Sequence, residues 1–185
     1  MSKIAIIDID NTLWQFCDPF YQTLKKINND FPTIDKWITS NIWEGYCSEE
    51  DFFAAINSIH HNQDSDAYKP YPESQGFLSS LKEQGYHIIV ASHRVPEMRE
   101  HTERWLTRHN LPHDELHISL NKTVLFPTAD VVVDDSAPTL KKAIESGALA
   151  AGLLFSWNRA YTGNGFGLFH NLNEVLEYIL KGAKD

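Results

Sequence analysis

A short aliphatic run at the start of the chain leads directly into two closely spaced aspartates. Residues 3–7 (KIAII) precede Asp8 and Asp10, which are one residue apart. A near-continuous aliphatic run is typical of a parallel strand covered on both faces, and open α/β sheets hold ligands at the carboxyl ends of such strands. Two carboxylates there need a cation or a proton to neutralise them. The segment therefore predicts a metal-assisted reaction centre, although aspartates after strands also make turns and cap helices.

Further runs with strand character alternate with helical patterns along the chain. The expected strands span 3–8, 86–92, 115–119, 130–134 and 148–155. The expected helices among them span 96–109, 137–146 and 172–180. Strands that alternate with helices predict an α/β fold with a doubly wound parallel sheet.

The long segment between the first two strands departs from this alternation. Apolar stripes follow the Asp18-Pro19 pair and run from Ile34 to Ile42, and Ser48 is placed to cap a third helix. The first stripe contains Phe20, Leu24 and Ile27, and the second contains Ile34, Trp37, Ile38 and Ile42. In the third helix, the side chains expected to face inward are Phe52, Phe53, Ile56 and Ile59. Because the segment is much longer than a usual crossover, we expect a small helical cap over 16–71, with 1–15 and 72–185 as the core domain.

Composition and charge restrict the partners. A length of 185 residues suits one domain with a modest insertion. The net charge of −9 argues against a nucleic acid or an anionic membrane as a large-surface partner, but a bound metal could still attract a small anion. The two cysteines lack metal-ligand spacing, and the chain shows neither a leader pattern nor a membrane-spanning run. We therefore expect a cytoplasmic protein.

Polar groups stand at or near the ends of later strands as well. Ser92 ends the second strand, Lys122 lies in the loop toward the fourth, and Asp134 and Asp135 end the fourth. Taken alone, Ser92 suits an ordinary strand-end hydroxyl, Lys122 suits a solvated surface charge, and the Asp134-Asp135 pair suits a helix cap. Parallel strands present their carboxyl ends on one edge, so these groups can converge with the first two aspartates. Together they suit phosphoryl transfer to a carboxylate, with one acid as nucleophile and another as proton carrier.

With these residues in this order, the whole chain resembles the haloacid dehalogenase (HAD) superfamily of phosphohydrolases, which have a Rossmann-like core. The resemblance implies that Asp8 is the nucleophile that forms an aspartyl phosphate. It implies that Asp10 is the general acid that protonates the leaving oxygen and then the base that activates water. Ser92 and Lys122 would hold the phosphoryl group. An acid at position 10 favours a phosphatase over the dehalogenase branch, which lacks this proton donor.

The resemblance also implies a metal site for Mg²⁺, a hard cation that prefers oxygen ligands. Its expected ligands are Asp8, Asp134 and the backbone carbonyl of Asp10. Two roles stay open for Asp135, which would hold the metal through water or orient Lys122.

A closer resemblance is to the 5'-nucleotidase family that includes the 5'(3')-deoxyribonucleotidases. Those enzymes carry a helical cap at this place, a first motif that continues into a phenylalanine, as in 8–16 here, and an aromatic-Asn signature after the last strand, similar to Trp157-Asn158. Aromatic residues of their cap stack on the nucleobase. The resemblance thus implies a (deoxy)nucleoside monophosphate as substrate, with Phe16 and Trp43 as stacking candidates, although both equally suit a core.

Several positions differ from that family pattern. Asn11 stands where glycine is usual, and Ser156 stands where proline is usual. Arg94, two residues after Ser92, would either touch a phosphate or sugar at the pocket mouth or be solvated at the start of a helix. The histidines, His60 included, show no ligand spacing and are expected to be structural or exposed. The substrate-binding candidates are Phe16, Trp43, Arg94, Trp157 and Asn158.

Other functions compete with a nucleotidase. Small magnesium-dependent phosphatases of phosphotyrosine or sugar phosphates share the first motif up to Trp14, but they have little cap. A regulatory phosphoacceptor would carry adjacent acids after its first strand, whereas Asp8 and Asp10 are separated. A silent metal- or nucleotide-binding module would not need the complete set of acids. The sequence therefore favours a Mg²⁺-dependent phosphomonoester hydrolase acting on a small molecule.

Overall fold

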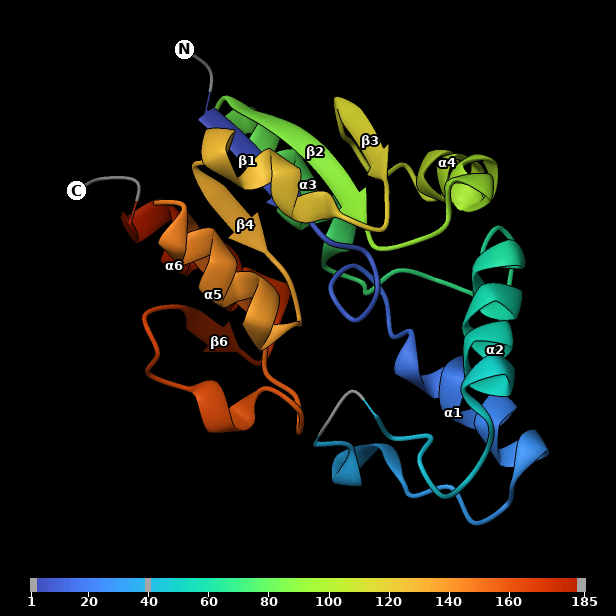
Figure 1. Ribbon diagram of the computed structural model, residues 1–185. Coiled ribbons are helices and arrows are strands. Elements are labelled where there is room, and N and C mark those ends of the chain that lie inside the picture. The colour runs from blue at the N-terminus through green and yellow to red at the C-terminus, as the bar shows by residue number, and fades with distance from the viewer. Residues whose placement is uncertain (1–2, 39–40, 183–185) are drawn as a thin grey trace.

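A single sheet of parallel strands organises the protein. The computed structural model describes residues 3–38 and 41–182, and Figure 1 shows the sheet with helices on both of its faces. The strands lie in the order β3-β2-β1-β4-β5-β6 and all pairs are parallel. Their bounds are β1 Lys3–Ile7, β2 Tyr86–Ser92, β3 Glu115–Ile118, β4 Val131–Val133, β5 Leu149–Leu153 and β6 Gly167–Phe169. The predicted doubly wound α/β fold is confirmed.

The helices follow the sequence pattern closely but not completely. Their bounds are α1 Cys17–Ile27, α2 Glu49–His61, α3 Ser74–Glu83, α4 Arg99–Arg108, α5 Ala137–Glu145 and α6 Leu172–Gly182. Short 3-10 turns cover Ile34–Lys36, Pro96–Met98, Lys122–Thr128 and Arg159–Tyr161. Neither α3 nor β6 was predicted from the sequence, and the three residues of β6 are too few to show an alternating pattern.

Alternate side chains of the central strands enter two different hydrophobic cores. Ile7 of β1 belongs to a core that includes apolar residues of α3 and α6, whereas Ile6 belongs to a second core with residues of α5. Strands that are buried on both faces need an almost unbroken run of aliphatic residues. This requirement explains the KIAII segment that opens the chain.

The strand order places a topological switch point between β1 and β4. From β1 the chain winds toward β2 and β3, and from β4 it winds in the other direction toward β5 and β6. Ile7 is in register with Val133, and the amide of Asp8 donates to the carbonyl of Val133 at 2.9 Å. Ligands of open α/β sheets bind at such a point. Asp8 and Asp134 therefore emerge side by side at the favoured place.

The segment expected as a cap contains two helices, α1 and α2, which lie together to one side of the sheet (Figure 1). Ser48 caps α2 as predicted, because its hydroxyl accepts from the amide of Asp51 at 3.1 Å. The stripe from Ile34 to Ile42 was expected to be helical but forms only a 3-10 turn over Ile34–Lys36, with 39–40 outside the described residues. The division into core and cap stays a prediction.

Phe53 was expected to face inward but is exposed, and so are Ile27 and Ile38 of the other two apolar stripes. The exposed fractions are 42% for Ile27, 71% for Ile38 and 48% for Phe53. Phe53 follows the buried Phe52 directly, and successive helical residues point about 100° apart. The helix pair has one buried stripe, formed by Phe20, Phe52 and their neighbours, so Phe53 falls outside it.

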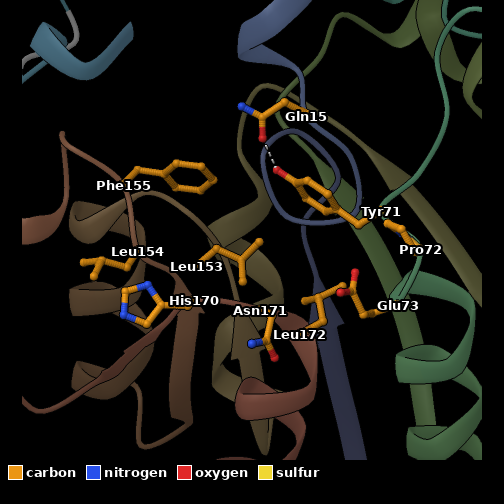
Figure 2. Close-up of a pocket in the computed structure, with 10 residues that line it drawn as sticks. All are labelled: Gln15, Tyr71, Pro72, Glu73, Leu153, Leu154, Phe155, His170, Asn171 and Leu172. Atoms are coloured by element: carbon orange, nitrogen blue, oxygen red, sulfur yellow. Dashed lines mark hydrogen bonds between the residues drawn. The ribbon is translucent and has the colours of Figure 1, made fainter.

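The residues at the two ends of the segment 16–71 are tied together. The amide of Tyr71 donates to the carbonyl of Leu13 at 2.8 Å, and its hydroxyl donates to the Gln15 side chain at 2.5 Å. Figure 2 shows this second bond beside a hollow of about 280 Å³ that Phe155 also lines. Within the part of the chain that the structure describes, no helix has the length and apolar character to cross a membrane.

Replacing Gly152 by alanine should destabilise the protein, because a Cβ at this position of β5 would lie 1.9 Å from the main-chain oxygen of Asp134. Overpacking of this kind costs roughly 1–3 kcal/mol of unfolding free energy. Gly76→Ala is the matched control, since a Cβ at this helical glycine meets nothing within 4 Å. Alanine there should stabilise the helix by roughly 0.5–1 kcal/mol. Chemical denaturation compares the variants, and unchanged stability of Gly152→Ala would contradict the prediction.

Candidate active site

Lys122 joins two carboxylates at the carboxyl edge of the sheet. Its Nζ lies 2.6 Å from Asp134 Oδ2 and also pairs with Asp8 Oδ1. All three side chains are buried. Burial favours the neutral amine, but Asp134 and Asp8 outweigh it and hold the pKa of Lys122 above its usual value. The structure thus brings together three residues that the sequence analysis placed on different segments.

The carboxylates at this edge have strongly altered proton affinities. Burial raises the pKa of Asp8 to about 7, against the lowering effect of Lys122 and with further increases from Asp134 and Asp10. Burial, then Asp134 and Asp8, raise the pKa of Asp135. A single ammonium group does not compensate three crowded acids, so a further cation would be favourable here.

The donor set at this edge suits a hard divalent cation. Oxygens of Asp8, Asp134 and Asp135 all lie within 4.8 Å of one another. Carboxylate oxygens are the ligands that Mg²⁺ prefers. The Asp10 carboxylate is not in this group, and it binds other partners. The expected role of the Asp10 carbonyl oxygen as a metal ligand stays a prediction.

Two side-chain donors hold Asp135. Trp157 Nε1 donates to its Oδ2 at 3.1 Å, and Asn11 Nδ2 donates to the same oxygen at 3.3 Å. The ion pairs of Lys122 within the described chain are with Asp8 and Asp134. Of the two roles left open for Asp135, the geometry favours the metal over orientation of Lys122.

Asn158 has a structural position in the same loop. Its Nδ2 donates to the carbonyls of Asp135 at 2.9 Å and Leu153 at 2.8 Å, and its Oδ1 accepts from the Phe155 amide at 2.8 Å. The residue is fully buried. It therefore fastens the segment after β5 to the metal-binding edge, and the expected substrate contact has no support from its geometry.

The backbone conformation at position 11 explains why asparagine can replace the glycine that is usual there in the 5'-nucleotidase family. Its φ of 55° lies in the left-handed region, which glycine occupies most easily and asparagine tolerates better than most residues. Its Oδ1 accepts from the Cys17 amide at 3.0 Å, while its Nδ2 reaches Asp135. Asparagine thus keeps the turn and adds two contacts that glycine could not make.

Asp10 lies in a separate network of donors. Its Oδ1 accepts from Arg94 Nη2 at 2.7 Å and from Trp14 Nε1 at 2.8 Å, and its Oδ2 lies 2.9 Å from His60 Nε2. Burial acts to raise the pKa of Asp10, but Arg94 and His60 outweigh it and hold the pKa below its usual range. Arg94 is neither at a pocket mouth nor solvated, because its side chain is 0% exposed.

Ser92 ends β2 beside β1, as predicted. Its hydroxyl is buried and has no hydrogen-bond partner among the described residues. Buried polar atoms are rarely left unsatisfied unless a ligand or water serves them. This free hydroxyl is consistent with a group that completes its bonding only when substrate binds.

Two hollows meet at Trp157. One of about 450 Å³ adjoins Asp135 and the start of α5, and one of about 200 Å³ has aromatic walls that include Phe16 and Phe52. Trp157 stacks on Phe155, with ring centroids 4.4 Å apart. Trp43 instead packs on Phe52 at 4.8 Å and is partly buried, which supports its core alternative.

The Mg²⁺ affinity should rise with pH up to about neutrality. Metal ligands must be ionised, and the pKa of Asp8 is raised to about 7, so that below this pH the metal has to displace a proton. Affinity should then fall by about tenfold for each pH unit below that value and level off above it. Calorimetric titration in buffers of different ionisation enthalpy would count the released proton. An affinity that does not change between about pH 5 and 8 would contradict this expectation.

Trp157→Phe should weaken Mg²⁺ binding by about tenfold or more, because it removes the N–H that holds Asp135 and keeps an aromatic ring against Phe155. The matched control is Trp43→Phe, a change in a tryptophan of the α1–α2 region that packs on Phe52. The same titration measures both variants. Equal affinities for Trp157→Phe and wild type would show that the indole does not support the metal site.

No protein-family model and no curated protein matches the sequence. Solved structures match it closely in fold. A predicted phosphatase from Clostridium acetobutylicum aligns with a TM-score of 0.68 at 18% identity, over 98% of this chain and 99% of that one. A Thermotoga maritima structure described as a beta-phosphoglucomutase has a TM-score of 0.65 at 17% identity, over 97% and 99%.

A third structure of similar fold contains a bound metal. A Bacillus subtilis protein described as a HAD hydrolase and bound to magnesium aligns with a TM-score of 0.62 at 11% identity, over 96% of this chain and 98% of that one. The alignments cover almost the full length of both partners. The chain therefore has the fold of the haloacid dehalogenase-like hydrolases.

Proposed function

We propose that the protein is a Mg²⁺-dependent phosphomonoester hydrolase that acts through an aspartyl phosphate on Asp8. The observation that carries this proposal is the set of buried Asp8, Lys122 and Asp134, with the partly buried Asp135, at the switch point of the sheet. A carboxylate nucleophile, a fixed cation and ligands for a divalent metal are the groups that phosphoryl transfer requires. The metal-bound structure of the same fold supports the choice of Mg²⁺.

In the first step Asp8 attacks phosphorus, and the bond from phosphorus to the leaving oxygen breaks. Asp10 must first take up a proton, because Arg94 and His60 favour its ionised form, and it then passes that proton to the oxygen, so that a neutral alcohol leaves. Lys122 neutralises the negative charge beside Asp8, and the free hydroxyl of Ser92 donates to a phosphoryl oxygen. Bound Mg²⁺ would supply Lewis acidity and charge neutralisation at the phosphoryl group.

In the second step water attacks the phosphorus of the aspartyl phosphate. Asp10, now ionised, takes a proton from the water, and the bond between phosphorus and the Asp8 oxygen breaks. Inorganic phosphate leaves and the Asp8 carboxylate is restored. Asp10 thus serves as acid and then as base, in the roles that the resemblance implies.

A (deoxy)nucleoside monophosphate is the substrate we propose. Support comes from the aromatic hollow around Phe16 and Phe52, which adjoins Trp157 and hence the metal-binding edge. Flat bases bind well to aromatic walls, at roughly 1–3 kcal/mol for each stacked base in single-strand binders. A sugar phosphate is the second candidate, favoured by the likeness of fold to the structure described as a beta-phosphoglucomutase.

Phosphate release from a panel of nucleoside monophosphates, sugar phosphates and an aryl phosphate tests the reaction and its substrate. Release should require Mg²⁺, stop with a chelator and be fastest for nucleotides. Asp8→Asn should reduce turnover by at least about 1000-fold, because the nucleophile is lost. Asp18→Asn, in the same part of the chain but exposed, is the matched control.

Other results of these assays would each reject a different part of the proposed function. Activity confined to sugar or aryl phosphates would keep the mechanism and reject the nucleotide. Turnover by Asp8→Asn would reject the aspartyl phosphate. A stable phosphoprotein without turnover would show a phosphoacceptor instead, and metal binding without phosphorylation would show a silent binding module.

A further inference from the structure

A buried arginine holds Asp10 from the core side. The Arg94 side chain has no exposed surface, and its Nη2 donates to Asp10 Oδ1 at 2.7 Å. Its Nη1 donates to Thr102 Oγ1 at 2.8 Å and to the Gln63 side chain. Thr102 in turn bonds to the Met98 carbonyl at 2.9 Å. The guanidinium is therefore fixed in orientation as well as in position.

A histidine holds the other oxygen of the same carboxylate. His60 lies in the last turn of α2, is buried, and places Nε2 2.9 Å from Asp10 Oδ2. Its ring packs against Phe16, with centroids 5.2 Å apart. Asp10 thus has one oxygen bound from the core and the other from the segment expected as a cap. Asp10, His60 and Arg94 are far apart in the sequence, so their contacts form only in the folded protein.

The charge balance shows that this contact is specific. Within the described residues, Asp10 is the carboxylate with which Arg94 forms an ion pair. A buried cation without its partner costs several kcal/mol, so the guanidinium and the carboxylate keep each other in place. A surface arginine with several acidic neighbours would hold none of them so firmly.

We propose that Arg94 and His60 are positioning residues that fix the Asp10 carboxylate for proton transfer, and that α2 thereby takes part in assembling the reaction centre. The proposal rests on the function proposed above. General acids act only from within hydrogen-bond reach of the proton acceptor, and a small misplacement lowers the rate sharply. With Arg94 and Trp14 on one oxygen and His60 on the other, the carboxylate has little freedom to rotate.

The proposal has a chemical signature in the leaving group. An alkyl ester, such as a nucleoside monophosphate, expels a strongly basic oxygen that needs a proton. A nitrophenyl ester expels a stable anion that needs much less help. Loss of Asp10 positioning should therefore slow the alkyl ester more than the nitrophenyl ester, whereas general loss of structure slows both equally.

The experiment compares Arg94→Met and His60→Phe with wild type. Methionine fills the space of the arginine without its charge, and phenylalanine keeps a ring against Phe16 without a donor. The matched control is Arg104→Met, which breaks the 2.6 Å ion pair from Arg104 on α4 to Asp64 without touching Asp10. We measure kcat/KM with saturating Mg²⁺ for a nucleoside monophosphate and for para-nitrophenyl phosphate, and thermal unfolding of each variant.

For both test variants, kcat/KM for the nucleotide should fall by about 100-fold. The fall for para-nitrophenyl phosphate should be smaller than this by a factor of about five or more. Arg94→Lys should recover part of the loss, because lysine restores the positive charge but not the two-nitrogen hydrogen-bonding geometry of the guanidinium. The kcat/KM of Arg104→Met should stay within about twofold of wild type. Should Arg94→Met not fold, His60→Phe decides alone.

Equal losses for the two esters, or losses no larger than for Arg104→Met, would overturn the positioning role while leaving the proposed hydrolysis intact. A wild-type protein that hydrolyses neither ester would overturn the hydrolysis itself and the positioning role with it. The two failures are thus distinguishable in one set of measurements.

Discussion

The candidate site depends on one buried ammonium group. Lys122 pairs with Asp8 after β1 and with Asp134 after β4, which are the two strands that flank the switch point. Removal of one member of a buried ion pair leaves an uncompensated charge that costs roughly 3–5 kcal/mol. The same contact therefore fixes the edge of the sheet and makes a pair of acids tolerable inside the protein. This one interaction therefore serves both the stability of the fold and the proposed chemistry.

Strand-end residues were the part of the site that the sequence could predict. Asp8, Ser92 and Asp134 each end an aliphatic run, and a parallel sheet aligns the ends of such runs on one edge. The helix α2 was likewise predictable, because Ser48 and the periodic apolar residues after it are local signals. Residues that contact their partners through regular geometry can be placed from sequence in this way.

The surroundings of Asp10 and Asp135 could not be predicted by the same reasoning. The contact of His60 with Asp10 depends on how α2 packs against the core, and no periodicity encodes that packing. Arginine is typical of surface positions, and the burial of Arg94 is explained by its ion pair with Asp10 and its hydrogen bonds to Gln63 and Thr102. Trp157 and Asn158 stood out in the sequence, but their hydrogen bonds show support of Asp135 that the pattern alone did not reveal.

The bond between Tyr71 and Leu13, with the neighbouring contact to Gln15, has a consequence for how such proteins diversify. Because Leu13 and Tyr71 lie side by side, the length of the segment between them does not affect how this bond joins its two ends. Closing a longer loop adds only about 0.6 kcal/mol for each doubling of its length. A segment of another size can therefore replace this one without rebuilding the sheet, provided that it again supplies a partner for Asp10 in the place of His60.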